Sequence, residues 1–140
     1  MQEGNLTPVK SVLKIDKVVF DDLSFHRFGF ESNDRSVPTE LGIAKDVKKL
    51  SDGYYRVSVK ATVTRKEEYE ASVQISGFCY IDESLENKDE LLNANAVSIL
   101  FAYVRSQLTL LTAQPGMSPV VLPVMNVAEM IKNGEKPSTK

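Results

Sequence analysis

The sequence contains few side chains that could carry out catalysis. His26 is its sole histidine and Cys79 its sole cysteine, so a histidine-based triad or a histidine–cysteine metal site would lack members. Asp21 and Asp22 are adjacent, and because neighbours in a strand point to opposite faces, we do not expect them to converge. Cys79 falls on the apolar side of a strand pattern, as a small buried hydrophobe does. The sequence therefore predicts no enzyme, no metal and no cofactor.

The composition is that of one soluble globular domain. The chain has 140 residues, of which 42% are hydrophobic and 26% charged. Its net charge of -2 argues against nucleic acid as the main partner. No apolar window is long enough to cross a bilayer, and the N-terminus lacks the pattern of a secretory signal, so we expect a cytoplasmic location and no membrane insertion. We expect a single domain over residues 10–132, with flexible tails at 1–9 and 133–140.

The first half of the chain has the period of β-strands. Apolar residues alternate with polar ones over 55–63 and again over 69–81, which predicts two antiparallel strands with one buried face. Asp52-Gly53 is a tight-turn signal leading back to a strand at roughly 41–50. The apolar run from Val12 to Phe25 alternates imperfectly, which indicates a bend or bulge. We expect four antiparallel strands in a meander.

The second half has the period of helices. From Asn95, an apolar stripe through Val97, Leu100, Val104 and Leu108 predicts one helix. A second apolar stripe indicates that this helix is covered on two sides, and we predict an oligomer interface there formed by Ala96, Ile99, Tyr103 and Leu110.

The last part of the chain predicts a second helix. Pro115-Gly116 ends the first one, residues 119–123 form an extended apolar segment, and Asn126 can cap a short final helix with Glu129 three residues on. The expected fold is α+β, a four-stranded antiparallel sheet with two helices packed on one face.

One turn-rich segment carries unusual aromatic surface. Leu23, Phe25, Phe28 and Phe30 fall within eight positions of a stretch that also contains Gly29. Two interpretations stay open and are compatible: a core flap under a long loop, or an aromatic wall for an apolar ligand such as a peptide.

Several stretches, in this order and spacing, resemble the SecB family of protein-export chaperones. They are the opening run 13–18, Asp22-Leu23-Ser24-Phe25, the hairpin 54–81, the helix start 99–105, and Leu122-Pro123-Val124-Met125-Asn126. The resemblance covers roughly residues 13–131. It implies the fold expected above, assembled as a homotetramer that is a dimer of dimers.

The resemblance also implies a chaperone that holds unfolded client polypeptides in apolar grooves for protein export and translocation. Phenylalanine and methionine suit unselective binding, because flat rings and flexible thioethers repack around many side chains. The positions that would line the groove are Phe25, Phe28, Phe30, Val37, Leu41, Val124, Met125, Val127 and Met130.

The resemblance is weaker at the positions that dock the motor protein SecA. Asp22 matches one acidic docking position, but His26 and Ser72 stand at two others. SecA therefore stays a candidate partner, whose docking positions on this family are matched only in part by this sequence. Two alternatives to a general export chaperone remain: a dedicated chaperone of a single partner such as an antitoxin, and a small-ligand or adaptor domain that reuses the fold.

Overall fold

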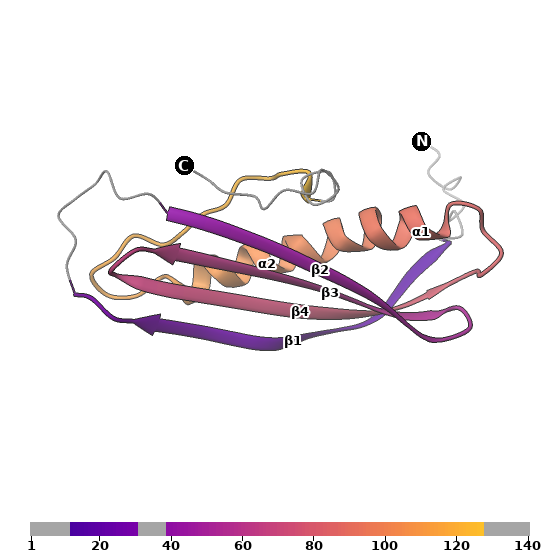
Figure 1. Cartoon of the computed structure of the whole chain (residues 1–140), viewed down its shortest axis with the longest axis horizontal. Helices are drawn as coiled ribbons and strands as arrows, with labels where there is room; N and C mark the ends of the chain where they lie inside the picture. Colours follow the sequence, from indigo (N-terminus) through magenta and orange to yellow (C-terminus); the bar gives the residue numbers. More distant parts are fainter. Residues whose placement is uncertain (1–11, 31–38, 128–140) are drawn as a thin grey trace, which may run out of the picture.

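The computed structural model describes residues 12–30 and 39–127, which form one antiparallel sheet with a long helix on one face (Figure 1). The α+β fold and the four-stranded sheet are confirmed. Of the two expected helices, the described residues contain one packed on the sheet; the other, predicted after Asn126, lies outside them except for Val127. The strands are β1 (Leu13–Arg27), β2 (Thr39–Ser51), β3 (Tyr54–Arg65) and β4 (Tyr69–Ile81), and the helical region is α1 (Lys88–Glu90), the π-helical turn η2 (Leu91–Ala96) and α2 (Val97–Leu111).

The strand order corrects the expected meander. The order is β1-β4-β3-β2, so β2, β3 and β4 follow one another through hairpins while β1 lies beside β4 at the far edge. This is a Greek key arrangement. The number of residues between the two strands is consistent with this order, because β1 ends at Arg27 and β2 begins at Thr39, whereas neighbouring strands of a hairpin are joined by a tight turn.

The core lies between the sheet and α2. The alternation predicted for β3 and β4 is confirmed, since Val57, Val59, Val73 and Ile75 are all fully buried. Gly77 of β4 allows the close approach of α2, because a Cβ there would lie 2.9 Å from a Leu100 methyl. The inward residues of α2 are Val97, Leu100, Phe101, Val104 and Leu108.

The helical region begins earlier than its periodicity indicates and buries one residue predicted at the surface. It starts at Lys88 rather than near Asn95, because the extra residue of the turn η2 breaks the helical period in the sequence. Ala96 was expected in the outer stripe but is fully buried in the core. The physical reason is its spacing: Ala96 lies four residues before Leu100, on the same inward row.

Strand β1 contains two β-bulges, which confirms the irregularity expected from its sequence. The register shifts between Ile15 and Lys17 and again between Phe20 and Asp22. The second bulge overturns the expectation that Asp21 and Asp22 point to opposite faces. Asp22 pairs with Gln74 on the face away from α2, and the Asp21 carboxylate accepts a 2.5 Å hydrogen bond from Ser76 on that same face. We call this face, opposite α2, the open face.

A carboxylate joins the β2–β3 turn to the start of the helical region. The Glu83 carboxylate accepts hydrogen bonds from the Gly53 amide (2.7 Å), the Tyr55 hydroxyl (2.8 Å) and the Lys88 ammonium (2.9 Å). Lys49 lies 3.3 Å away as a further ion partner. These donors, the Gly53 amide first, lower the pKa of Glu83 to about 2.

This low pKa predicts a pH-dependent effect of Glu83→Gln. The folded pKa lies below the ordinary value of 4.5, so the charged form stabilises the fold above that value, and the stabilisation is lost as pH falls toward about 2. We expect Glu83→Gln to lower the unfolding temperature at neutral pH, and the difference from wild type to shrink between about pH 5 and pH 2. Thermal unfolding at several pH values measures it, with the exposed Glu86→Gln as control. A difference that does not change with pH would contradict this role.

Candidate functional site

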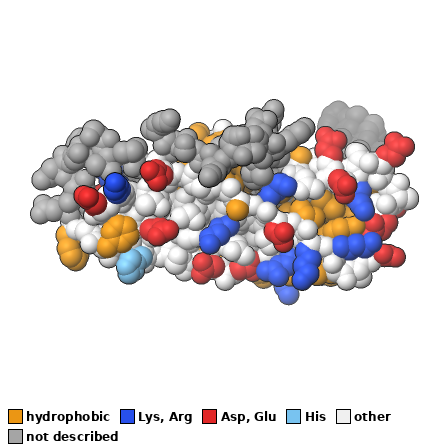
Figure 2. Space-filling model, in the orientation of Figure 1, with side chains coloured by type: hydrophobic (Ala, Val, Ile, Leu, Met, Phe, Trp, Pro, Cys, Tyr) orange, Lys and Arg blue, Asp and Glu red, His pale blue; other side chains and the backbone are white. Residues whose placement is uncertain are grey.

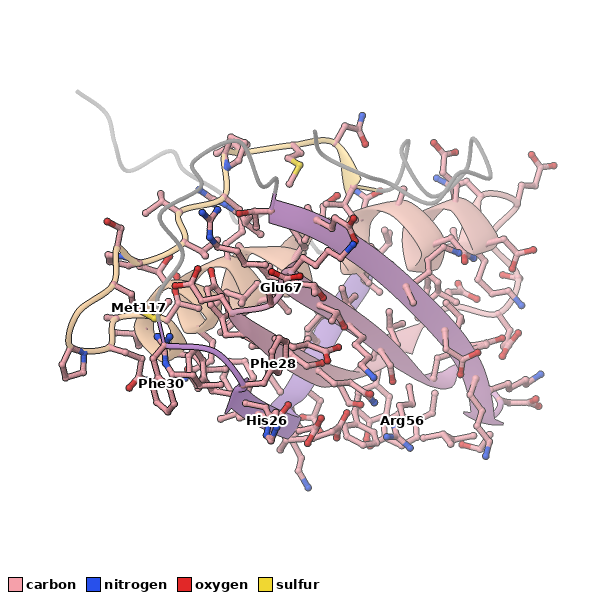
Figure 3. All side chains as sticks on the ribbon, turned by 60° about the vertical axis from the view of Figure 1, so that its left-hand side comes forward. His26, Phe28, Phe30, Arg56, Glu67 and Met117 are labelled. Atoms are coloured by element: carbon pink, nitrogen blue, oxygen red, sulfur yellow. The ribbon has the colours of Figure 1, made fainter. Side chains whose placement is uncertain are left out.

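The aromatic segment lies at the end of β1. Phe25 is half-buried and stacks on Tyr69 with ring centroids 5.4 Å apart. Beyond it the side chains turn outward: Phe28 is 49% exposed and Phe30 is 88% exposed (Figure 3). His26 is exposed at the strand end, as expected, with its ring 5.8 Å from that of Phe28. The segment therefore combines one ring that packs on the core with two rings that face solvent.

The backbone of this segment is tied to the β3–β4 turn. The amides of Phe28 and Gly29 donate to the Glu68 carbonyl at 3.0 and 3.2 Å. The Arg27 guanidinium donates to the Gly29 carbonyl at 2.9 Å and reaches the sulfur of Met117, beyond α2, at 3.1 Å. A Cβ on Gly29 would lie 2.0 Å from the Glu67 carbonyl oxygen, so only glycine allows this approach. The exposed ring of Phe28 thus extends from a backbone held by hydrogen bonds, and Phe30 follows two residues later.

The segment after α2 forms the second half of the predicted groove. Residues 118–126 are extended, as expected from the sequence, and return along the helix (Figure 1). The buried Thr112 hydroxyl accepts from the Val120 amide at 2.8 Å, while Thr109 donates to the Val120 carbonyl at 2.8 Å and Arg105 to the Leu122 carbonyl at 3.1 Å. These bonds hold the segment on the helix.

The predicted groove residues fall into different environments. Leu41 and Val127 are buried core residues, so neither is available to a ligand. Met125 is half-buried, whereas Val124 is 83% exposed. Val37 and Met130 lie outside the described residues.

Sequence reasoning missed Val121, which is 73% exposed. The extended run from Pro119 to Pro123 carried the signal, because adjacent residues of an extended chain point to opposite sides and Leu122 is buried. The two halves of the predicted groove approach each other where the Arg27 guanidinium reaches Met117, which precedes the segment after α2. Phe28 and Phe30 follow β1, at the opposite edge of the sheet from β2.

The outer side of α2 carries the other predicted surface. Ile99 and Tyr103 are each 47% exposed and Leu110 is 66% exposed. On the neighbouring strand β1, Phe20 and Leu23 point to the helix side of the sheet but remain 38% and 45% exposed. A single chain thus leaves uncovered an apolar surface on α2 and on β1.

The docking positions lie on the open face with uneven accessibility. Asp22 is exposed, opposite Gln74, and His26 is exposed opposite Glu70. Ser72 is 8% exposed and hydrogen bonds to Thr62 at 3.3 Å, so it offers little surface to a partner.

The reactive side chains that the structure describes are Cys79, His26 and scattered acidic residues. Cys79 is fully buried, as predicted, and burial raises the pKa of its thiol to about 11. Within residues 12–30 and 39–127, His, Cys, Asp and Glu nowhere gather in a group of three that could hold a metal ion. No helix in these ranges has the length and apolar character needed to cross a membrane.

The close approach at Gly29 predicts a sensitive position. In Gly29→Ala the added methyl would meet backbone rather than a flexible side chain. We therefore expect the hydrogen bonds from the Phe28 and Gly29 amides to the Glu68 carbonyl to be lost, and the free energy of unfolding to fall by roughly 1–3 kcal/mol. Chemical denaturation measures the loss, and hydrogen exchange at Phe28 locates it. Gly42→Ala on β2 is the matched control, because nothing lies within 4 Å of its added Cβ. Equal stability of the two variants would refute this account of Gly29.

Comparison with known proteins places this fold in a family. The sequence model of the family described as "Preprotein translocase subunit SecB" matches residues 7–136. The "Protein-export protein SecB" of Neisseria meningitidis is 29% identical over 129 residues, which cover 84% of this chain and 86% of that protein. An uncharacterized protein of Methanocaldococcus jannaschii is 27% identical over 137 residues, covering 92% and 88% of the two chains.

A solved structure has the same fold. The SecB-like chaperone of Mycobacterium tuberculosis, in complex with a peptide from the HigA1 antitoxin, superposes with a TM-score of 0.66 at 11% sequence identity, covering 81% of this chain and 90% of that one. The family match, which spans nearly the whole sequence, agrees with this fold. The chain therefore belongs to the SecB family.

Proposed function

We propose that this protein is a molecular chaperone that holds unfolded polypeptides on exposed apolar surface. The observation that carries the proposal is the exposed aromatic pair Phe28 and Phe30, of which Phe28 extends from a hydrogen-bonded backbone. Membership of the SecB family supports a chaperone, and the related fold from M. tuberculosis holds a peptide of a partner protein. Both favour binding over catalysis.

A chaperone that binds unfolded chains of many sequences must hold them through contacts that do not depend on sequence. Each exposed ring or branched side chain contributes a shallow apolar contact, worth about 25 cal/mol per Å² buried. Because the amides of Phe28 and Gly29 already donate to the Glu68 carbonyl, ordering the backbone at Phe28 on binding costs little further entropy. Val121 and Val124 supply further contacts from a second fixed backbone. Together, such contacts give weak binding to many client sequences and no strong preference for one of them.

The second candidate function is that of a dedicated chaperone, which binds a single partner. Delivery to SecA would use acidic side chains on the open face, where this chain has Asp22 but His26 and the buried Ser72 in the other two places. A dedicated chaperone, for example of an antitoxin, does not need that docking surface. The related chaperone crystallised with an antitoxin peptide supports this alternative equally.

We also propose that the chain assembles, as a homotetramer, through the outer side of α2. Ile99, Tyr103 and Leu110 form a stripe too apolar to remain in water on an isolated helix face. A second copy that presents the same stripe would cover it.

Suppression of aggregation tests the chaperone proposal. We expect the wild-type chain to suppress aggregation of a chemically unfolded, unrelated protein on dilution, and the double variant Phe28→Ala/Phe30→Ala to need several-fold more chain for the same effect, since it loses both exposed rings. Light scattering during dilution measures this. The control is Tyr80→Ala, an aromatic residue of matched exposure, 48% against 49% for Phe28, at the other end of the sheet.

Two results would count against a general chaperone. If Tyr80→Ala lost as much suppression of aggregation as the double variant, any exposed ring would serve, and the surface around Phe28 would have no special role. No suppression by the wild-type chain at any ratio would favour the single-partner alternative, to be sought by pull-down.

Tyr103→Glu tests the assembly proposal. A carboxylate in a buried interface costs several kcal/mol, so we expect the variant to fall to a smaller oligomer while its circular dichroism still shows the sheet. Light scattering coupled to size exclusion gives the mass. Ser98→Glu is the matched control, because Ser98 is exposed on α2 about 100° around the helix axis from Ile99, outside the stripe. An unchanged mass in Tyr103→Glu would place the interface elsewhere.

A further inference from the structure

The open face carries two neighbouring rows of cations and aromatic rings at the end near the β2–β3 turn. In the first row Lys14 of β1 lies opposite Tyr80 of β4, which lies opposite Tyr54 of β3. In the second row Lys17 lies opposite Phe78, followed by Arg56 of β3 and Lys48 of β2. Figure 2 shows apolar side chains gathered at this end of the face, with Lys, Arg and some acidic side chains around them. We call Lys14, Lys17, Lys48, Tyr54, Phe78 and Tyr80 the lysine–aromatic patch.

The charge in this patch is not balanced within the described residues. There, no carboxylate lies within ion-pair distance of the ammonium groups of Lys14, Lys17 or Lys48. Arg56 does have a partner, Asp21 at 3.7 Å on the adjacent strand. Lys48 lies directly opposite Arg56, and like charges in cross-strand pairs destabilise a sheet. The patch therefore keeps positive charge at a cost that an anionic partner would offset.

The rings favour a peptide over a nucleic acid. Bases stack on free ring faces, but Tyr54 packs against Tyr80 at 4.6 Å and against Phe78 at 6.3 Å, and the Lys17 ammonium lies 5.6 Å from the centre of the Phe78 ring. These contacts cover part of the ring faces within the patch. The pKa of Tyr54 is raised, by burial first and then by Tyr80 and Asp16.

The spacing also fits an extended acidic segment. The two rows are two residues apart along β4, about 7 Å, which is the distance between alternate side chains of an extended peptide. Only alternate side chains of such a segment face the patch, so a carboxylate can reach the cations of one row while an apolar side chain two residues further on meets the rings of the other. Only a few cations take part, so the site is too short for the many phosphate contacts on which nucleic-acid affinity depends.

We propose that the lysine–aromatic patch docks an extended acidic segment of a partner protein, one in which Asp or Glu residues are interspersed with apolar side chains. This surface is separate from the client surface around Phe28 and Phe30, which follows the opposite end of β1 (Figure 3). The partner would thus bind while a client is held. The docking segment is negatively charged, whereas the acidic side chains Asp21 and Asp22 would attract a positively charged one.

Binding of a labelled model peptide tests this proposal. The probe is a short fluorescent peptide in which Asp, Phe, Glu and Leu occupy alternate positions with Ser between them, titrated with the full-length chain and followed by fluorescence anisotropy. We expect binding that weakens with salt, and a loss of about tenfold or more in Lys17→Glu/Lys48→Glu, because two attractive charges become repulsive. The matched control is Lys60→Glu/Lys66→Glu, which makes the same change in net charge at exposed positions outside the patch.

The outcomes separate the proposal from its rivals. An equal loss in both double variants would mean that net charge alone acts, and tighter binding of a single-stranded oligonucleotide than of the peptide would assign the patch to nucleic acid; either overturns the proposal. A smaller oligomer in Lys17→Glu/Lys48→Glu would overturn it too, by placing a second copy on the patch. Unchanged suppression of aggregation in that variant shows that its lost binding is independent of client holding.

Discussion

The packing of α2 on β3 and β4 is the constraint on which the rest of the structure depends. Ala96, Leu100, Val104 and Leu108 form one inward row at four-residue spacing, and all four are fully buried. Each large side chain of such a row contributes about 1.5–3 kcal/mol through burial. Gly77 sets the depth of this packing, because a larger residue there would displace Leu100. A helix held this closely on one side can leave its other side free for contacts between chains.

Much of this fold could be predicted from the sequence, because its period-two and helical patterns are local. The buried alternation of β3 and β4, the bulged β1 and the Asp52-Gly53 turn all follow from neighbouring residues. The strand order could not be predicted in this way, since the position of β1 beside β4 depends on pairing between residues far apart in the chain. Ala96 was misplaced because a small residue fits both a surface stripe and a tight core.

The exposure of the candidate site residues was only partly predictable. Aromatic density in a turn-rich stretch left open a core flap or an aromatic wall, and the structure has Phe28 and Phe30 exposed while Phe25 is half-buried. The burial of Leu41 depends on tertiary packing that no local pattern contains, and the convergence of Asp21 and Asp22 on the open face depends on a bulge whose position the sequence did not specify. The lysine–aromatic patch was not foreseen either, because Lys14, Lys48 and Phe78 belong to three strands and meet only through the register of the sheet.

The π-helical turn η2 has a consequence for how this chain tolerates changes in length. It holds one residue more than an α-helical turn of the same rise, and it separates α2 from Lys88, which bonds to Glu83. Deleting one residue from Leu91–Ala96 would turn this wide turn into an ordinary α-helical one and keep Lys88 and α2 on their present sides of the helix axis. Inserting one residue there would instead rotate everything before it by about 100° around the axis, so that the Lys88 ammonium would face away from Glu83. The helical region therefore accommodates the loss of one residue at η2 better than the gain of one.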